Sequence, residues 1–158
     1  MVFSDIGCYT LGALKPFEAI NTCVDMGASV TMAKGAADAG MHPAIGLIGD
    51  STFTHSGITG LLDAVNDKSH VTIIISDNAT TAMTGGQDSA GTHKLHSICE
   101  GIGVEPSHIR TITPISTGLQ ENIQIIREEI EYKGVSVIIA QRECVQVAIR
   151  NKKKNKTS

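Results

Sequence analysis

The chain has 158 residues, 41% hydrophobic and 18% charged, a length and balance that suit one folded domain and exclude a disordered chain. Its net charge is −3, and its apolar runs end well before the roughly 18 residues that a membrane-spanning helix needs. Since it has no basic-then-apolar leader and no basic body, we expect it to bind neither membrane nor nucleic acid and not to be secreted.

Short apolar runs alternate with segments of helical spacing along the chain. Strands are predicted at 44–48, 71–75, 109–112 and 135–140. Helices are predicted at 29–39, 57–66, 94–101 and 117–132. The second and last strands are rich in β-branched residues without strict alternation, which is typical of strands buried on both faces. This order predicts an α/β fold, a doubly wound, mostly parallel sheet with helices on both faces.

The helix at 117–132 has the clearest pattern. Thr117 followed by Gln120 predicts a capping box at its start. Four apolar residues fall on one stripe, which predicts that this stripe is core. They are Leu119, Ile123, Ile126 and Ile130.

Basic residues gather at the end of the chain. Five of the thirteen lie in the last nine residues, which leaves eight basic against sixteen acidic residues in the body. We therefore expect one domain over residues 1–149, followed by a flexible basic tail over 150–158.

The four cysteines form no Cys-x-x-Cys pair. They are Cys8, Cys23, Cys99 and Cys144. Iron–sulfur and structural zinc sites normally use closely spaced thiolates, so we expect no such cluster on this chain. Without a secretory signal, reduced thiols in the cytoplasm are expected.

Polar residues follow two of the predicted strands directly. Gly49-Asp50-Ser51 ends the first run, and Ser76-Asp77-Asn78 ends the second. Parallel strands present their carboxyl ends at one edge, where ligands bind. A carboxylate and an amide oxygen there suit Mg²⁺, and a glycine lets a phosphate approach the backbone. The structural alternative is that Asp50 caps a helix and Asn78 makes a turn.

These two segments resemble the thiamine-diphosphate motif, which begins Gly-Asp-Gly/Ser and ends in Asn-Asn. Asp77 replaces the first of those asparagines, and Asn78 keeps the second. With residues 4–12, 26–29, 49–57 and 77–87, the chain resembles the C-terminal thiamine-diphosphate domain of the large subunit of indolepyruvate:ferredoxin oxidoreductases, within the 2-oxoacid:ferredoxin oxidoreductase family. The resemblance covers roughly residues 3–142.

The resemblance implies a role for individual residues. Asp50 and Asn78 would bind Mg²⁺ through side-chain oxygens, and Thr80 through its carbonyl. Other residues would contact thiamine diphosphate: Gly7, Cys8, Gly49 and Ser51 at the diphosphate and thiazolium, Gly27, Ala28 and Ser29 at the aminopyrimidine, and Thr81 and Met83 on the long loop 79–93.

Two histidine features have structural alternatives. His55 could shuttle a proton at the substrate carbonyl because a histidine pKa lies near neutral, but its position also suits a residue that orders the loop. His93 and His96 are three residues apart, and too few other ligands lie nearby for a zinc site, so we expect them on the surface.

The family resemblance also implies an activity and partners. Such enzymes decarboxylate an aryl 2-oxoacid, pass electrons through iron–sulfur clusters on other domains to ferredoxin, and transfer the acyl group to coenzyme A. Every matched motif belongs to the diphosphate half of the site, so a pyrimidine-binding domain or subunit must complete it. We expect little turnover by the chain in isolation, and a homodimer through the face left exposed.

Two other functions remain open at this point. The chain could be the equivalent subunit of a non-oxidative 2-oxoacid decarboxylase, or a non-catalytic interaction module on the same fold. A dinucleotide-binding domain is excluded because no Gly-x-Gly-x-x-Gly follows a strand.

Overall fold

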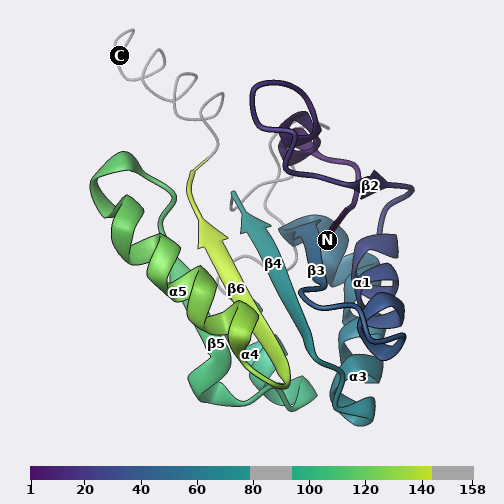
Figure 1. Cartoon of the computed structure of the whole chain (residues 1–158). Helices are drawn as coiled ribbons and strands as arrows, with labels where there is room; N and C mark the ends of the chain where they lie inside the picture. Colours follow the sequence, from purple (N-terminus) through teal and green to yellow (C-terminus); the bar gives the residue numbers. More distant parts are fainter. Residues whose placement is uncertain (79–93, 144–158) are drawn as a thin grey trace, which may run out of the picture.

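The computed structural model describes residues 1–78 and 94–143, which form a six-stranded sheet (Figure 1). The strand order is β2-β1-β3-β4-β6-β5, and all the described pairs are parallel. The strands are β1 (Val2–Ser4), β2 (Thr22–Cys23), β3 (Ile45–Gly49), β4 (Val71–Asp77), β5 (Ile109–Ile112) and β6 (Val135–Gln141). The predicted α/β class with a parallel sheet is confirmed.

Helices cover the two faces of the sheet unequally. The α-helices are α1 (Ala28–Asp38), α2 (Asp50–Thr52), α3 (Ile58–Asp67), α4 (Leu95–Ile102) and α5 (Leu119–Glu131). A π-helical turn, η2 (Phe53–Gly57), joins α2 to α3, and 3₁₀ turns form η1 (Cys8–Ala13), η4 (Pro106–His108) and η5 (Ser116–Gly118). Helices α1, α3 and α4 share one apolar core, whereas α5 packs on β4 and β6 from the other side (Figure 1).

The side-chain alternation of β4 separates the two faces. Ile73 and Ile75 are fully buried in the core shared with α1, α3 and α4. Thr72 points the other way, because successive strand residues face opposite sides, and its hydroxyl donates to the Glu129 carbonyl of α5 at 3.1 Å. Ser136 of β6 donates to the same carbonyl at 3.0 Å. Both hydroxyls thus fix α5 to the central strands.

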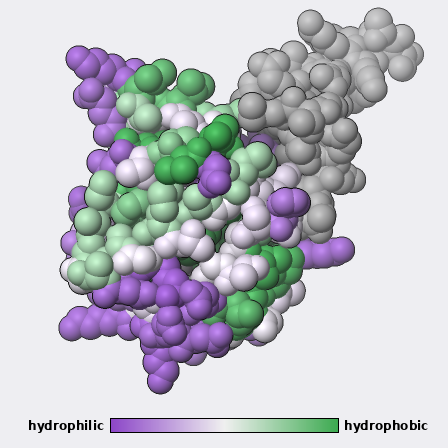
Figure 2. All heavy atoms as spheres, turned by 90° about the vertical axis from the view of Figure 1, so that its right-hand side faces the viewer, coloured by the Kyte–Doolittle hydropathy of each residue, from purple (hydrophilic) through white to green (hydrophobic). Residues whose placement is uncertain are grey.

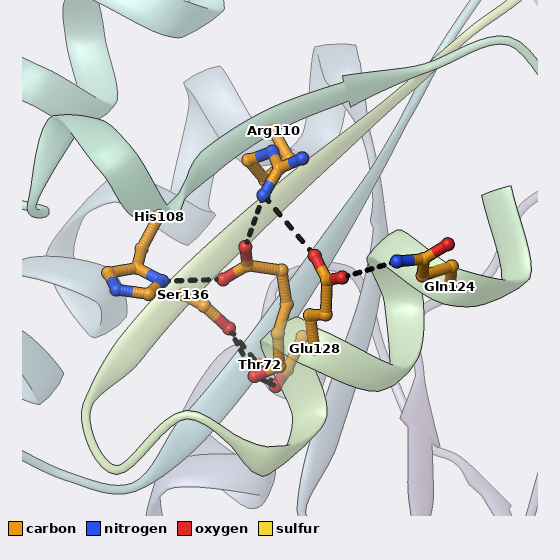
Figure 3. Close-up of polar contacts among 7 residues, drawn as sticks. Thr72, His108, Arg110, Gln124, Glu128 and Ser136 are labelled. Carbon is orange, nitrogen blue, oxygen red and sulfur yellow. Dashed lines mark hydrogen bonds and ion pairs between the residues drawn. The ribbon is translucent and has the colours of Figure 1, made fainter. Parts of the chain in front are cut away.

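A buried ionic cluster lies between α5, η4 and β5 (Figure 3). The Glu129 side chain is 2% exposed, and its carboxylate lies 2.8 Å from His108 Nδ1 and 3.3 Å from Arg110 Nη1. The His108 ring stacks on Tyr132, with ring centroids 3.4 Å apart. A buried carboxylate needs such partners, so the cluster ties the carboxyl end of α5 to the neighbouring edge strand.

Two expectations for the last helix are wrong. The helix begins at Leu119 after Gly118, without a side-chain cap, because Thr117 lies within η5. The predicted apolar stripe is not fully core: Leu119 is 53% exposed and Ile123 is half-buried, while Glu129 is buried. Since α5 packs chiefly on β6 and part of β4, only part of its apolar surface meets the sheet.

Residues 79–93 and 144–158, including the predicted long loop and basic tail, lie outside the described residues. Within the described ranges, no helix combines the length and apolar character needed to cross a bilayer.

Candidate functional site

The carboxyl ends of β1, β3 and β4 lie at one edge of the sheet, the upper edge in Figure 1. Ser4 pairs with Leu47, and Gly49 pairs with Ser76, so the segments that follow these strands start side by side. The predicted meeting of Gly49–Ser51 and Asn78 at a common edge is confirmed. The connection after β1 leads outward to β2, whereas that after β3 leads to β4 on the other side. Such a divergence opens the crevice in which parallel sheets bind ligands.

The segment after β3 turns directly into a helix. Gly49 is extended and precedes α2, and Asp50, its first helical residue, is 3% exposed. Gly49, and not Asp50, occupies the cap position, so a capping role does not account for Asp50. The Thr54 hydroxyl donates to the carbonyls of Asp50 and Ser51 at 3.2 and 3.0 Å, which fixes this turn. The π-helical turn that follows is a feature often found at functional sites.

The segment after β1 lies against the end of β3. The Gly7 N–H donates to Thr10 Oγ1 at 2.9 Å, and that hydroxyl donates to the Asp5 carbonyl at 3.0 Å. The Tyr9 ring lies against two glycines. A β-carbon on Gly7 would lie 2.5 Å from Tyr9 Cε1, and one on Gly49 would lie 3.4 Å from the same atom. The glycines therefore make room for the ring between β1 and β3.

The turn before α1 is held by a buried carboxylate. The two oxygens of Asp5 accept the backbone N–H groups of Gly27 and Ser29, each at 2.7 Å. Gly27 has a φ of +101°, which favours glycine, and a β-carbon there would lie 2.5 Å from Ser56 Oγ. Asp5 thus fixes the Gly27–Ser29 turn to the end of β1, beside the η2 turn.

The Tyr9 hydroxyl is buried in this crevice. Its oxygen has no hydrogen-bond partner in the described part of the chain. Burial raises the pKa of Tyr9 well above its usual range, and the charge of Asp5 adds to the rise. The backbone N–H of Gly49 lies near the phenol oxygen and opposes that rise in pKa. The phenol therefore stays protonated and can donate.

The remaining predicted residues differ in exposure. Asn78 is half-buried directly after β4, while Cys8 and His55 are exposed. His96 is also exposed, as predicted, 3.9 Å from Glu100. Burial raises the pKa of Cys99 to about 12, as suits an inert core thiol. Thr80, Thr81, Met83 and His93 lie outside the described residues.

Sequence reasoning missed Asp5 and Tyr9 as residues of this crevice. Asp5 follows a strand of only three residues, too short to predict from its pattern. Tyr9 is placed by its packing against Gly49, which is forty positions away in the sequence. The one available signal was the glycine pair itself, since Gly7 and Gly49 leave space for a bulky neighbour.

A comparison with family models identifies the fold. The model for the C-terminal TPP-binding domain of thiamine pyrophosphate enzymes matches residues 5–140. The chain belongs to this family. TPP is another name for thiamine diphosphate, so the family is the one whose motif Gly49–Ser51 and Asn78 resemble.

The TPP-binding domain is also similar to curated proteins. Subunit IorA of the indolepyruvate oxidoreductase of Archaeoglobus fulgidus is 37% identical over 152 residues, which cover 89% of the chain and 24% of that subunit. The chain thus spans about a quarter of the length of this curated relative.

Two solved structures share the fold. A 2-oxoglutarate:ferredoxin oxidoreductase from Magnetococcus marinus superposes with a TM-score of 0.69 at 16% identity, over 90% of this chain and 54% of the other. A benzoylformate decarboxylase from Polynucleobacter necessarius gives 0.65 at 20% identity, over 90% and 30%. At these identities the likeness concerns the fold of the TPP-binding domain.

Proposed function

We propose that residues 1–149 form the diphosphate-binding half of an aryl 2-oxoacid:ferredoxin oxidoreductase, with indolepyruvate as the expected substrate, and that 150–158 form a basic tail. The observation that carries this proposal is the meeting of Gly49–Ser51 and Asn78 at one sheet edge in a chain of the TPP-binding family. The 37% identical relative named as an indolepyruvate oxidoreductase subunit supports the substrate class.

The residues at this edge suit a magnesium diphosphate. Asp50 offers a carboxylate and Asn78 an amide, the hard oxygen ligands that Mg²⁺ prefers. Gly7 and Gly49 carry no side chains at this edge, and the Tyr9 ring lies against both. We therefore assign Asp50 and Asn78 to Mg²⁺, together with the carbonyl of Thr80, which lies outside the described residues.

We assign the other cofactor contacts to residues near the same sheet edge. The diphosphate and thiazolium would lie against Gly7, Cys8, Gly49 and Ser51. The aminopyrimidine would lie against the Gly27–Ser29 turn, with Thr81 and Met83 contributing from outside the described residues. Thiamine diphosphate, when bound, supplies the chemistry that decarboxylates a 2-oxoacid. His55, exposed on η2, is the candidate to hold a proton at the substrate carbonyl.

A partner must complete this half-site, and the chain has a surface that suits one. Residues 6–26, the apolar arm, run from the end of β1 past η1 to the start of α1. Figure 2 shows hydrophobic surface at the upper end of the side that faces the viewer. The exposed large apolar side chains of this arm are Ile6, Leu11, Leu14, Phe17, Val24 and Met26. We propose that a pyrimidine-binding domain or subunit covers the apolar arm, and that without it the chain forms a homodimer there.

The complete enzyme would carry the rest of the reaction. The electron pair that stays on the substrate carbon when carbon dioxide leaves would pass, as two single electrons, through iron–sulfur clusters on other domains to ferredoxin, and coenzyme A would take the acyl group. A non-oxidative decarboxylase would instead release an aldehyde. Acyl-CoA and reduced ferredoxin from the reconstituted cytoplasmic complex would support our proposal, and a free aldehyde would favour the alternative.

The first test is a calorimetric titration of thiamine diphosphate into the chain, with Mg²⁺ and with a chelator. We expect binding that requires Mg²⁺ and that weakens by at least about tenfold in Asp50→Asn, since each charged contact contributes roughly 1.5–3 kcal/mol. Glu105→Gln is the matched control, because Glu105 is exposed near the opposite ends of the strands.

The titration is repeated with the pyrimidine-binding partner present. Binding with equal affinity in wild type and Asp50→Asn would contradict the metal assignment. Absence of binding even with the partner would contradict the proposed function and favour an interaction module.

A further inference from the structure

The crevice between the ends of β1 and β3 holds a side chain that the cofactor assignment does not use. Tyr9 lies against the backbone of Gly7 and Gly49, where β-carbons would lie 2.5 and 3.4 Å from its Cε1. The ring therefore lines the place where the connections from β1 and β3 diverge. Ligands of parallel sheets bind at such a point.

The end of this side chain is polar, buried and unsatisfied. The Tyr9 hydroxyl has no hydrogen-bond partner among residues 1–78 and 94–143. Leaving such a group buried without a partner costs about 1–3 kcal/mol. A cost of this kind is retained where a ligand supplies the missing partner, as in active sites that are prepared before binding.

The surroundings define what that ligand must be. The phenol is protonated at neutral pH, so the ligand must offer an acceptor for its O–H group. The carboxylates of Asp5 and Asp50 lie near enough to affect its titration, so a bare anion would be repelled. Asp5 already accepts two backbone N–H groups, and the proposed function assigns Asp50 to Mg²⁺. An anion accompanied by a divalent metal satisfies both conditions.

We propose that Tyr9 is a cofactor-contacting residue whose hydroxyl donates a hydrogen bond to the metal-bound diphosphate beside Gly49. This inference rests on the proposed function and adds a donor to it from the segment after β1.

The test uses inorganic diphosphate with Mg²⁺, which does not absorb where tyrosine does. The sequence holds two tyrosines and no tryptophan, so Tyr9 is the only source of tyrosine emission in a Tyr132→Phe background. Tyr132 stacks on His108 in the cluster beneath α5, so this background keeps the crevice intact. We expect Mg²⁺-diphosphate to change the Tyr9 emission and its second-derivative absorbance, and the change to disappear with Asp50→Asn.

Affinity provides the second measurement. Tyr9→Phe keeps the ring and removes the donor, and we expect calorimetric binding of Mg²⁺-diphosphate and of Mg²⁺-thiamine diphosphate to weaken about tenfold or more. Tyr132→Phe is the matched control and should bind as wild type does. Thermal unfolding of each variant checks that the fold is kept, and Tyr9→Leu, which also lacks the donor, should show the same weakening.

The outcomes separate this inference from the proposed function. Asp50-dependent binding with unchanged or tighter affinity in Tyr9→Phe overturns the role of Tyr9 and leaves the proposed function standing. Absence of Asp50-dependent binding in wild type, with the pyrimidine-binding partner present, overturns both.

Discussion

At the scale of single residues, two glycines near α1 differ in whether a side chain could replace their hydrogen. Gly27 has a φ of +101°, and a β-carbon on it would lie 2.5 Å from Ser56 Oγ. Gly35 lies within α1, and a β-carbon there would meet no atom within 4 Å. One glycine is required by its turn, whereas the other only weakens its helix.

We therefore expect alanine to act in opposite directions at these two positions. Gly27→Ala should lower the free energy of unfolding by about 1–3 kcal/mol, because it adds backbone strain and a clash. Gly35→Ala should raise it by about 0.5–1 kcal/mol through helix propensity. Urea unfolding followed by circular dichroism measures both. Equal effects of the two substitutions would contradict the geometry of the Gly27 turn.

His70 makes the stability of the fold depend on pH. Its ring stacks on His42, with centroids 3.9 Å apart, just before β4. Burial lowers the pKa of His70, and the charges of His42 and Lys133 add to the decrease. The unfolded chain then binds a proton more readily than the folded chain, so stability is full above the usual histidine pKa, about 6.5, and falls as pH decreases through the folded value.

The pH profile of thermal unfolding tests this. We expect the melting temperature of the wild type to fall between about pH 7 and pH 5, and His70→Gln to flatten that part of the profile. His96→Gln, at an exposed position on α4, serves as the control. A slope that His70→Gln leaves unchanged would show that other groups cause the decrease.

At the scale of elements, the buried end of α5 can be tested by a matched pair of glutamates. Glu129 is 2% exposed and contacts His108 and Arg110, whereas its neighbour Glu128 is 48% exposed and 3.7 Å from Arg110 (Figure 3). Glu129→Gln should lower the free energy of unfolding by about 1–3 kcal/mol, because charged hydrogen bonds are lost. Glu128→Gln should change it by less than about 0.5 kcal/mol. Chemical denaturation of the two variants gives the comparison, and similar losses would contradict the buried cluster.

The same scale shows which elements the sequence could predict. The longer strands β3, β4 and β6 stand out as short apolar runs, and β4 and β6 are rich in β-branched residues. Strands β1 and β2 have three and two residues, too few for any periodicity, and depend on pairing within the sheet. The α5 stripe was misjudged because apolar spacing identifies a helix but not how much of its apolar surface the sheet covers.

At the scale of the whole molecule, the exposed side chains of the apolar arm are where we expect the partner to bind. Phe17 is 73% exposed and Leu14 60%, values that are unusual for large apolar side chains in a folded domain. We expect the double variant Leu14→Ser, Phe17→Ser to weaken binding of the pyrimidine-binding partner about tenfold or more, and to reduce self-association of the chain.

Leu62→Ser is the control for this experiment, because Leu62 is 44% exposed on α3, outside the apolar arm. Analytical ultracentrifugation measures self-association, and surface plasmon resonance measures the partner affinity. Unchanged association in the double variant, with weakening in Leu62→Ser, would move the interface from the apolar arm to α3.

The candidate site was predictable only in part. Gly49–Ser51 and Asn78 follow long strands and carry a known motif, so their common edge could be inferred. Asp5 and Tyr9 could not, because their positions depend on β1 pairing with β3 and on packing between distant segments.

The Asp5 carboxylate has a consequence for the thermodynamics of binding. Because it holds Gly27 and Ser29 by two short hydrogen bonds, the wall of the crevice before α1 is fixed by the fold itself. A ligand that arrives there does not have to order that turn, so little conformational entropy is lost at this wall. Weakening the Asp5 bonds would therefore reduce affinity through entropy, even though Asp5 would never touch the ligand.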